Sequence, residues 1–153
     1  MIYRKSKKED VASLYELMCI LENKTLPYDV FLEIYEEQLA SKNSYCLVAE
    51  KENKMVAMLN MRFERQLHHC EKIAEVMEFV VLEKERNLGI GKAMFQKACE
   101  IAKENGCPQI ELATNQLRLH AHRFYEREGM SNFHYKFSMR LDDKQFADNK
   151  IGN

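Results

Sequence analysis

The 153-residue sequence lacks a large excess of charge of either sign, a long apolar run and an internal repeat. Its formal net charge is −1, from 23 basic and 24 acidic residues, so the composition does not indicate a nucleic-acid partner. No segment approaches the length of a transmembrane helix, and the N-terminus lacks the apolar stretch of a signal peptide. We therefore expect neither a nucleic acid nor a membrane as a partner.

The sequence also lacks a Cys-x-x-Cys pair, and its five cysteines are odd in number. Cys46 and Cys99 stand among apolar neighbours, which is typical of small core residues. This usage favours reduced thiols and a cytoplasmic location. We predict no metal site, because His68 and His69 have no third ligand at a recognisable spacing.

No linker or low-complexity stretch divides the chain, and 46% of its residues are hydrophobic. These features predict a single domain over residues 1–141, followed by a polar tail over residues 142–153.

Hydrophobic spacing and breaker residues predict the element order β-α-α-β-β-β-α-β-α-β. A capping box formed by Ser6 and Glu9 predicts that the first helix starts at Ser6. The polar residues 64–72 are expected to form a loop. Early hairpins followed by strand-helix-strand crossovers imply a mixed sheet. The expected strands are 2–5, 45–50, 55–63, 77–82, 108–114 and 132–141, and the later helices are 29–40, 89–105 and 117–128.

The apolar run that includes Phe79, Val80 and Val81 leads into Arg-Asn-Leu-Gly-Ile-Gly, residues 86–91, here called the glycine loop. Glycines at the start of a helix let the backbone approach an anion, and the free N–H groups of the helix can bind it. A dinucleotide fingerprint would need a third glycine where Met94 stands, and a P-loop would need a hydroxyl residue where Ala93 stands. Both motifs are therefore excluded.

Glu78 lies in the middle of this apolar strand, where a carboxylate is costly unless it has a task or a partner. Burial would raise its pKa and suit it to act as a base. The alternative is a glutamate that points to solvent from a half-exposed face. Glu75 is a second candidate base, and a bulge in the strand would bring both carboxylates to one side.

The pattern Arg-x-x-Gly-x-Gly, its place after a strand and the element order resemble the GNAT superfamily of N-acetyltransferases. The segment from Ala121 to Gly129 resembles the superfamily's Ala-x-x-Phe-Tyr-x-x-x-Gly motif. The resemblance implies a GNAT fold of the α/β (α+β mixed) class, with a mostly antiparallel sheet of about six to seven strands and about four helices. It also implies acetyl-CoA as the cosubstrate.

The resemblance further assigns roles to single residues. Glu78 would be the general base, with Glu75 as the alternate, and Tyr125 would be the general acid that protonates the leaving thiolate. His120 stands where the family commonly has Asn, which puts that coenzyme contact in doubt. The implied coenzyme-binding residues are Phe79, Val80, Val81, Arg86, Asn87, Leu88, Gly89, Ile90, Gly91, Lys92, Asn115 and His120.

A narrower resemblance rests on residues 67–69, 75–78, 111–115 and 121–129, and on the spacing of His134 and Phe137. It is to the aminoalkylphosphonate N-acetyltransferases and spans roughly Leu14 to Leu141. It implies a small amine acceptor that carries a phosphonate, for which His68, His69, His134 and Arg62 are candidate binding residues. We expect direct attack by the amine in a ternary complex, and a homodimer is possible. Two alternatives stay open, a protein or peptide N-acetyltransferase and a non-catalytic CoA-binding regulatory module.

Overall fold

A computed structural model describes residues 1–142 of the chain. Two compact units divide the chain, residues 1–113 and the residues from Thr114 onward. The predicted tail falls almost entirely outside the described residues, and the single-domain assignment stays a prediction. The strands of the first unit are β1 (Ile2–Lys5), β2 (Ser44–Lys51), β3 (Lys54–Gln66), β4 (Glu71–Val81) and β5 (Gln109–Leu112). Its helices are α1 (Val11–Glu22), α2 (Tyr28–Ala40) and α3 (Ile90–Glu104).

The five strands form one mixed sheet in the order β1-β2-β3-β4-β5. The first three pairings are antiparallel, and β4 pairs with β5 in parallel. The crossover between these parallel strands is α3, as a strand-helix-strand unit requires. The mixed sheet was therefore predicted correctly, but the expected count of six to seven strands was too high for the described residues.

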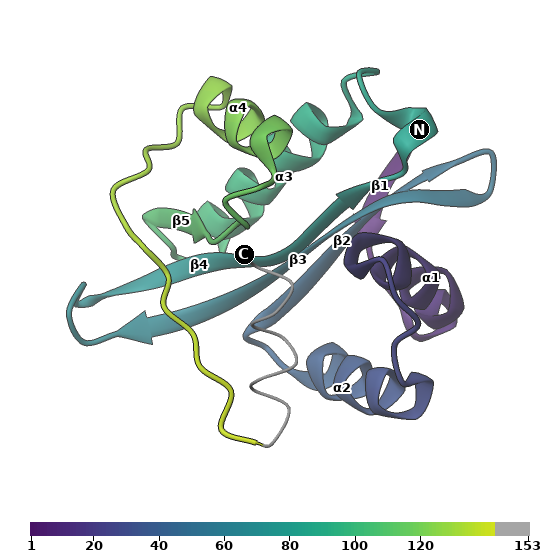
Figure 1. The fold of residues 1–153 in the computed structure, drawn as a ribbon, viewed down its shortest axis with the longest axis horizontal. Helices are drawn as coiled ribbons and strands as arrows, with labels where there is room; N and C mark the ends of the chain where they lie inside the picture. The colour runs from purple at the N-terminus through teal and green to yellow at the C-terminus, as the bar shows by residue number, and fades with distance from the viewer. Residues whose placement is uncertain (143–153) are drawn as a thin grey trace. The chain divides into compact units, whose positions relative to one another are not determined.

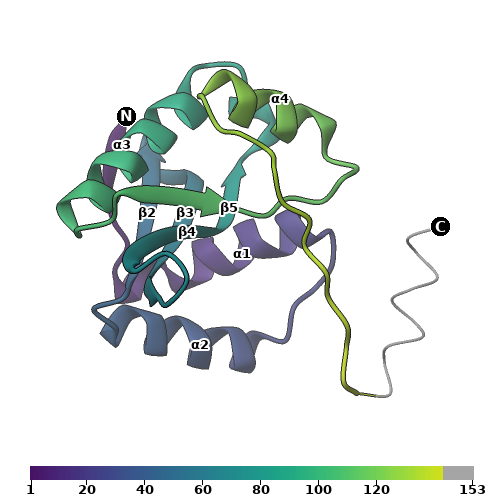
Figure 2. The same ribbon diagram turned by 90° about the vertical axis from the view of Figure 1, so that its left-hand side faces the viewer.

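Helices cover both faces of this sheet. Figures 1 and 2 show α1 and α2 on one face and α3 on the opposite face. Alternation along β2 and β3 places Val48 and Met58 with Leu14 of α1 in one buried cluster. The next residue along β3, Leu59, is fully buried and points to the opposite face. Helix α3 covers that face with Met94. Because both faces are covered, the middle strands are apolar on both sides, so a polar residue there needs a reason.

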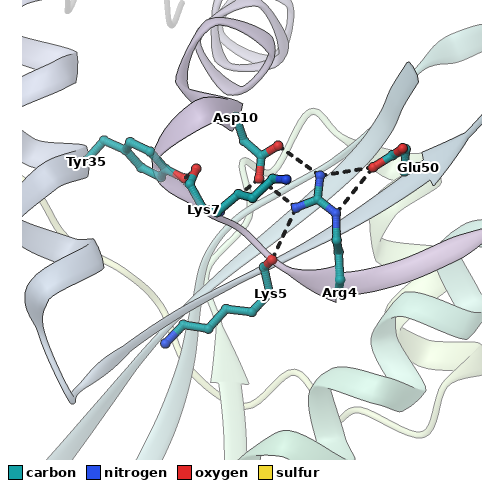
Figure 3. Close-up of polar contacts among 6 residues, drawn as sticks. All are labelled: Arg4, Lys5, Lys7, Asp10, Tyr35 and Glu50. Atoms are coloured by element: carbon teal, nitrogen blue, oxygen red, sulfur yellow. Dashed lines mark hydrogen bonds and ion pairs between the residues drawn. The ribbon is translucent and has the colours of Figure 1, made fainter. Parts of the chain in front are cut away.

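A network of ionic and hydrogen bonds joins β1 to the start of α1 (Figure 3). The guanidinium of Arg4 donates to both carboxylate oxygens of Asp10, at 2.7 and 2.9 Å, and to Glu50 at 3.0 Å. This pairing with Arg4 lowers the pKa of Asp10. The hydroxyl of Tyr35 in α2 donates to the carbonyl of Lys7 at 2.8 Å. Both helices of this face are thus tied to the same short segment.

Three local predictions need correction. The expected loop over residues 64–72 instead continues β3 and β4, whose last pair is Gln66 with Glu71. A tight turn joins the two strands, and its last residue, Cys70, has a positive φ of 52°. The sequence did not predict this hairpin, because its side chains are polar and a solvated strand need not alternate apolar and polar residues. The first helix does not start at Ser6; a 3₁₀ turn over Lys8–Asp10 precedes α1, and the carboxylate that accepts from the Lys7 amide belongs to Asp10, not Glu9.

The second unit contains α4 (Leu119–Arg127) and an extended segment after it. The predicted last strand over 132–141 is not formed; no residue of this segment is assigned to a strand. Its apolar alternation is real, but Phe133 and Phe137 are exposed, and a strand exists only where a partner completes its hydrogen bonds. None of the helices formed by residues 1–142 is long and apolar enough to cross a membrane.

Candidate active site

A β-bulge in β4 sets the direction of its acidic side chains. Glu78 is opposite Asn60, whereas the next pair along the ladder is Val76 with Met61, so Met77 has no partner on β3. The extra residue shifts the alternation by one position, and Glu75 and Glu78 therefore share a face despite being three residues apart. The face is the one covered by α1 and α2.

Glu78 is half-buried on this face and accepts a hydrogen bond of 2.8 Å from the side-chain nitrogen of Asn60. Burial raises the pKa of Glu78, and the nearby carboxylate of Glu22 raises it further. The hydrogen bond from Asn60 lowers it, but by less than burial raises it. Glu78 can therefore exist in both protonation states nearer to neutral pH than an exposed glutamate, which is what a general base needs.

A cavity of about 330 Å³ lies between α1, α2 and the sheet, and we call it the α1–α2 cavity. Its wall is mostly apolar, and Asn60 and Glu78 are its polar groups on β3 and β4. Glu22 and Lys24, from the end of α1 and the residues after it, also line it, as does Lys5 of β1. A concave, mostly apolar space with a few polar groups is typical of a small-molecule site.

The other acidic candidate, Glu75, has a different partner. Its carboxylate accepts a hydrogen bond of 2.7 Å from the guanidinium of Arg62, which is opposite it on β3. Neither residue lines the α1–α2 cavity. The structure thus pairs Glu75 with Arg62 and does not place either residue in the wall of the α1–α2 cavity.

The glycine loop has the backbone geometry of an anion-binding turn. Asn87 and Gly89 both have positive φ, 62° and 80°, and Gly89 is the N-cap of α3. A side chain at Gly89 would meet no atom within 4 Å, so the φ angle, not crowding, favours glycine there. The carbonyl of Gly89 accepts the N–H of Ala93. The N–H groups of the first turn have no partner within the helix and can bind a pyrophosphate.

Two side-chain contacts fix the chain just before this loop. Lys51, the last residue of β2, donates to the largely buried carboxylate of Glu85 at 2.9 Å. The Nε of Arg86 donates to the carbonyl of Val81 at the end of β4, 3.1 Å away. Sequence reasoning missed Lys51 and Glu85, because both belong to polar segments where a charge has no evident function.

The parallel pairing of β4 with β5 ends at Val76 and Leu112, although β4 continues to Val81. The segment with Phe79, Val80 and Val81 therefore extends past its parallel neighbour while it stays paired with β3. This geometry fits an extended arm lying along β4 as an added strand. The residues of the first unit thus fit a long, anionic cosubstrate at both the glycine loop and the strand.

The remaining predicted residues lie outside these two features. In the second unit, the side-chain oxygen of Asn115 accepts the N–H of Leu117 at 2.8 Å, which forms the turn before α4. Within α4, the Tyr125 ring lies 5.3 Å from the Phe124 ring, measured between centroids, and His120 is exposed near the start of the helix. His134 is exposed in the segment that follows.

His68 and His69 lie together in the β3–β4 turn, with ring centroids 4.2 Å apart. The turn follows Gln66, and β3 extends six residues beyond Asn60 to reach it, roughly 20 Å at about 3.3 Å per residue. The structure therefore does not place this pair in the α1–α2 cavity with Glu78. Across residues 1–142, no cluster of three or more His, Cys, Asp or Glu side chains could hold a metal ion.

Comparison with known proteins identifies the family to which this geometry belongs. The model of the acetyltransferase (GNAT) family matches residues 9–130. The aminoalkylphosphonate N-acetyltransferase of Salmonella typhimurium is 35% identical over 138 residues, which cover 90% of each chain.

Solved structures agree on the fold. A transcriptional regulator from Bacillus halodurans superimposes with a TM-score of 0.85 and 26% identity, covering 92% of this chain and 99% of its own. AAC(6')-Iy, solved with the bisubstrate analogue CoA-S-monomethyl-acetylneamine, has a TM-score of 0.82 at 15% identity, covering 92% and 97% of the two chains. The chain therefore belongs to the acetyltransferase (GNAT) family, whose N-acetyltransferases use acetyl-CoA as their cosubstrate.

Proposed function

We propose that the chain transfers the acetyl group of acetyl-CoA to the primary amine of a small molecule held in the α1–α2 cavity. The observation that carries this proposal is the position of Glu78, a carboxylate with a raised pKa in the wall of a partly open cavity. The strand that carries Glu78 ends at Val81, and a 3₁₀ turn over Glu83–Glu85 connects it to the glycine loop. The proton acceptor and the anion-binding turn are thus only a few residues apart along the chain.

The proposed reaction needs a base and an acid, each assigned to one side chain. Glu78 accepts a proton from the ammonium form of the acceptor, directly or through water, and the free amine then attacks the acetyl carbon. The new N–C bond forms as the C–S bond breaks, and Tyr125 donates its phenolic proton to the thiolate. The second proton leaves the nitrogen as the neutral amide forms, and it restores the Tyr125 phenol through solvent. The N–H of Val80 is the proposed donor to the thioester oxygen.

Direct attack is favoured over an acetylated enzyme because the thiol in the cavity is a poor nucleophile. Cys46 lines the α1–α2 cavity, and burial raises its pKa to about 12. At neutral pH this cysteine is a neutral thiol, and the thiolate is the form that attacks a thioester. No covalent intermediate is therefore included in the proposal.

An anionic group on the acceptor is the next part of the proposal, and an aminoalkylphosphonate is its leading form. The relative from Salmonella typhimurium bears that substrate in its name, and Lys5 and Lys24 supply positive charge in the cavity wall. Arg62, His68, His69 and His134 stay candidates from the sequence, but the cavity wall includes none of them. We place the reaction in the cytoplasm, because all five cysteines are free.

The direct test is a thiol-release assay with acetyl-CoA and a panel of matched amines. Aminoalkylphosphonates, alkylamines of equal length without the phosphonate, polyamines, aminoglycosides and lysine peptides would be compared by kcat/KM. We expect the small aminophosphonates to react best. Equal rates for the matched alkylamines would contradict the anionic acceptor, and preference for lysine peptides would favour the protein-acetylating alternative. Binding of acetyl-CoA with no transfer to any amine would favour a regulatory module.

A further inference from the structure

A row of three polar side chains crosses the otherwise apolar core beneath α2. The side-chain nitrogen of Asn60 donates one hydrogen bond to Gln38 Oε1 and one to Glu78 Oε2, each 2.8 Å long. Gln38 belongs to α2, Asn60 to β3 and Glu78 to β4. Asn60 is only 7% exposed, and its strand neighbours Leu59 and Met61 are fully buried. A buried amide in such a strand is costly, so its hydrogen bonds must compensate for its desolvation.

The two acceptors determine which end of the Asn60 amide faces Glu78. An amide nitrogen has two hydrogens, and here each has its own acceptor. Asn60 Oδ1 is buried without a hydrogen-bond partner, which shows that the amide satisfies its nitrogen at the expense of its oxygen. Rotating the amide by half a turn would place Oδ1 against two oxygens. Gln38 therefore stabilises the orientation in which Asn60 presents an N–H to Glu78.

The orientation of Asn60 matters because burial and Glu22 favour the neutral form of Glu78. The lysines of the cavity wall are not its hydrogen-bond donors. Burial and the carboxylate of Glu22 in α1 both raise the pKa of Glu78. The Cys46 thiol of β2 is neutral, since its pKa is about 12. Lys5 and Lys24 line the same cavity, but Asn60 is the group that directly donates to the Glu78 carboxylate. Its hydrogen bond lowers the pKa of Glu78.

We propose that Gln38 and Asn60 are positioning residues that together keep Glu78 ionised and aimed for proton removal from the acceptor amine. The proposal rests on the proposed function, since it takes Glu78 as the general base. It links α2, a helix of the acceptor cavity, to the proton acceptor through a single amide. It also explains why a polar residue occupies the centre of β3.

The test is a titration of Glu78 itself in three proteins. The side-chain carboxyl of Glu78 would be followed by ¹³C NMR in the wild type, in Asn60→Leu and in Gln38→Met, with Glu78→Gln to assign the signal. Asn60→Leu removes the donor at similar volume, so we expect the pKa of Glu78 to rise by about one unit. Gln38→Met removes only the group that orients the donor, and we expect a smaller rise in the same direction.

Kinetics would connect the titration to the reaction. A base must be ionised to act, so a higher pKa moves the acidic limb of the kcat/KM profile to higher pH by the same amount. Gln96→Met is the matched control, because Gln96 is an exposed glutamine of α3. It should leave both the titration and the limb in place.

The outcomes separate this inference from the proposed function. A rise in the pKa of Glu78 that matches the shift of the acidic limb supports the proposal. An unchanged pKa of Glu78 in both variants overturns it, whatever the activity. A raised pKa of Glu78 with an unchanged acidic limb overturns the role of Glu78 as base, and the catalytic part of the proposal with it. If Asn60→Leu does not fold, Gln38→Met at its half-buried position decides the question.

Discussion

The strand β4 supports two parts of the proposed site, and they are built from different atoms. Toward its C-terminal end, the strand and the glycine loop offer main-chain groups in a geometry set by positive φ angles at Asn87 and Gly89. In its middle, the strand offers one side chain, Glu78, oriented by a bulge and by the Asn60 amide. Main-chain groups survive most substitutions, whereas a carboxylate is lost by changing one residue. The two parts should therefore respond to mutation in opposite ways.

The largest effect is expected at the side-chain part. Glu78→Gln keeps the size of the residue but removes its basicity, so we expect kcat to fall roughly 100- to 10,000-fold at neutral pH. Acetyl-CoA affinity, measured by isothermal titration, should stay nearly unchanged, because the coenzyme is held by the main chain. In the wild type, kcat/KM should fall as pH decreases through the raised pKa of Glu78.

Two results would contradict this assignment. An equal loss of acetyl-CoA binding in Glu78→Gln would indicate a structural role for the residue. A loss of activity in Glu75→Gln as large as that in Glu78→Gln would point to the alternate base. We expect a smaller loss there, because Glu75 is paired with Arg62 and does not line the cavity.

Tyr125→Phe should have the next largest effect. It removes one hydroxyl and leaves the ring that packs beside Phe124. Loss of one general acid should slow transfer by roughly 10- to 1000-fold. An acetyl donor whose leaving thiol has a lower pKa should restore part of the rate, because such a thiolate needs less protonation. Full activity of Tyr125→Phe with acetyl-CoA would exclude Tyr125 as the acid.

The backbone geometry of the glycine loop was easier to predict from the sequence than the contacts of Glu78. A positive φ at the start of a helix favours glycine, so the turn over residues 86–91 could be predicted from the residue types alone. Glu78 was proposed as a base because a carboxylate in an apolar strand is conspicuous. The same criterion applies to Asn60, which stands between Leu59 and Met61, but its partners could not be known before β3 was aligned with β4.

Other errors had the same physical origin. The polar residues 64–72 extend a hairpin, whereas the apolar residues 132–141 form no strand. The difference is whether a neighbouring strand is available, and local alternation does not predict that. His68 and His69 stay candidates from the sequence, but pairing of β3 with β4 places their turn beyond the end of β3, roughly 20 Å from Asn60 along the hairpin. Long-range pairing, not composition, decides each of these cases.

Gly89→Ala tests the main-chain part at the position where a side chain matters. Its φ is 80°, and an alanine there costs about 1–2 kcal/mol or forces the loop to change. We expect KM for acetyl-CoA to rise roughly tenfold, because the misaligned N–H groups bind the pyrophosphate less well. Catalysis at saturating acetyl-CoA should change much less than in Glu78→Gln.

Gly106→Ala is the matched control for this variant. Gly106 has a φ of 78°, and a side chain there would also meet no atom within 4 Å, but it lies beyond the far end of α3. Urea unfolding should show a similar loss of stability in both variants. Only Gly89→Ala should change KM for acetyl-CoA; a rise in both would mean that backbone strain, not the position of the loop, causes the effect.

The smallest effect is expected where a side chain supports the main-chain part from a distance. Lys51→Met removes the partner of Glu85, whose largely buried carboxylate fixes the turn before the glycine loop. We expect KM for acetyl-CoA to rise roughly two- to fivefold, because Lys51 is itself solvent-accessible and the pair is partly screened. Lys54, the first residue of β3, is opposite Lys51 in the ladder and forms no ion pair with Glu85, so Lys54→Met should leave KM unchanged. The rise in KM caused by Lys51→Met should be smaller at high salt, because salt already screens the Lys51–Glu85 pair in the wild type. A rise in KM that does not depend on salt would mean that lost packing, not the lost ion pair, is the cause.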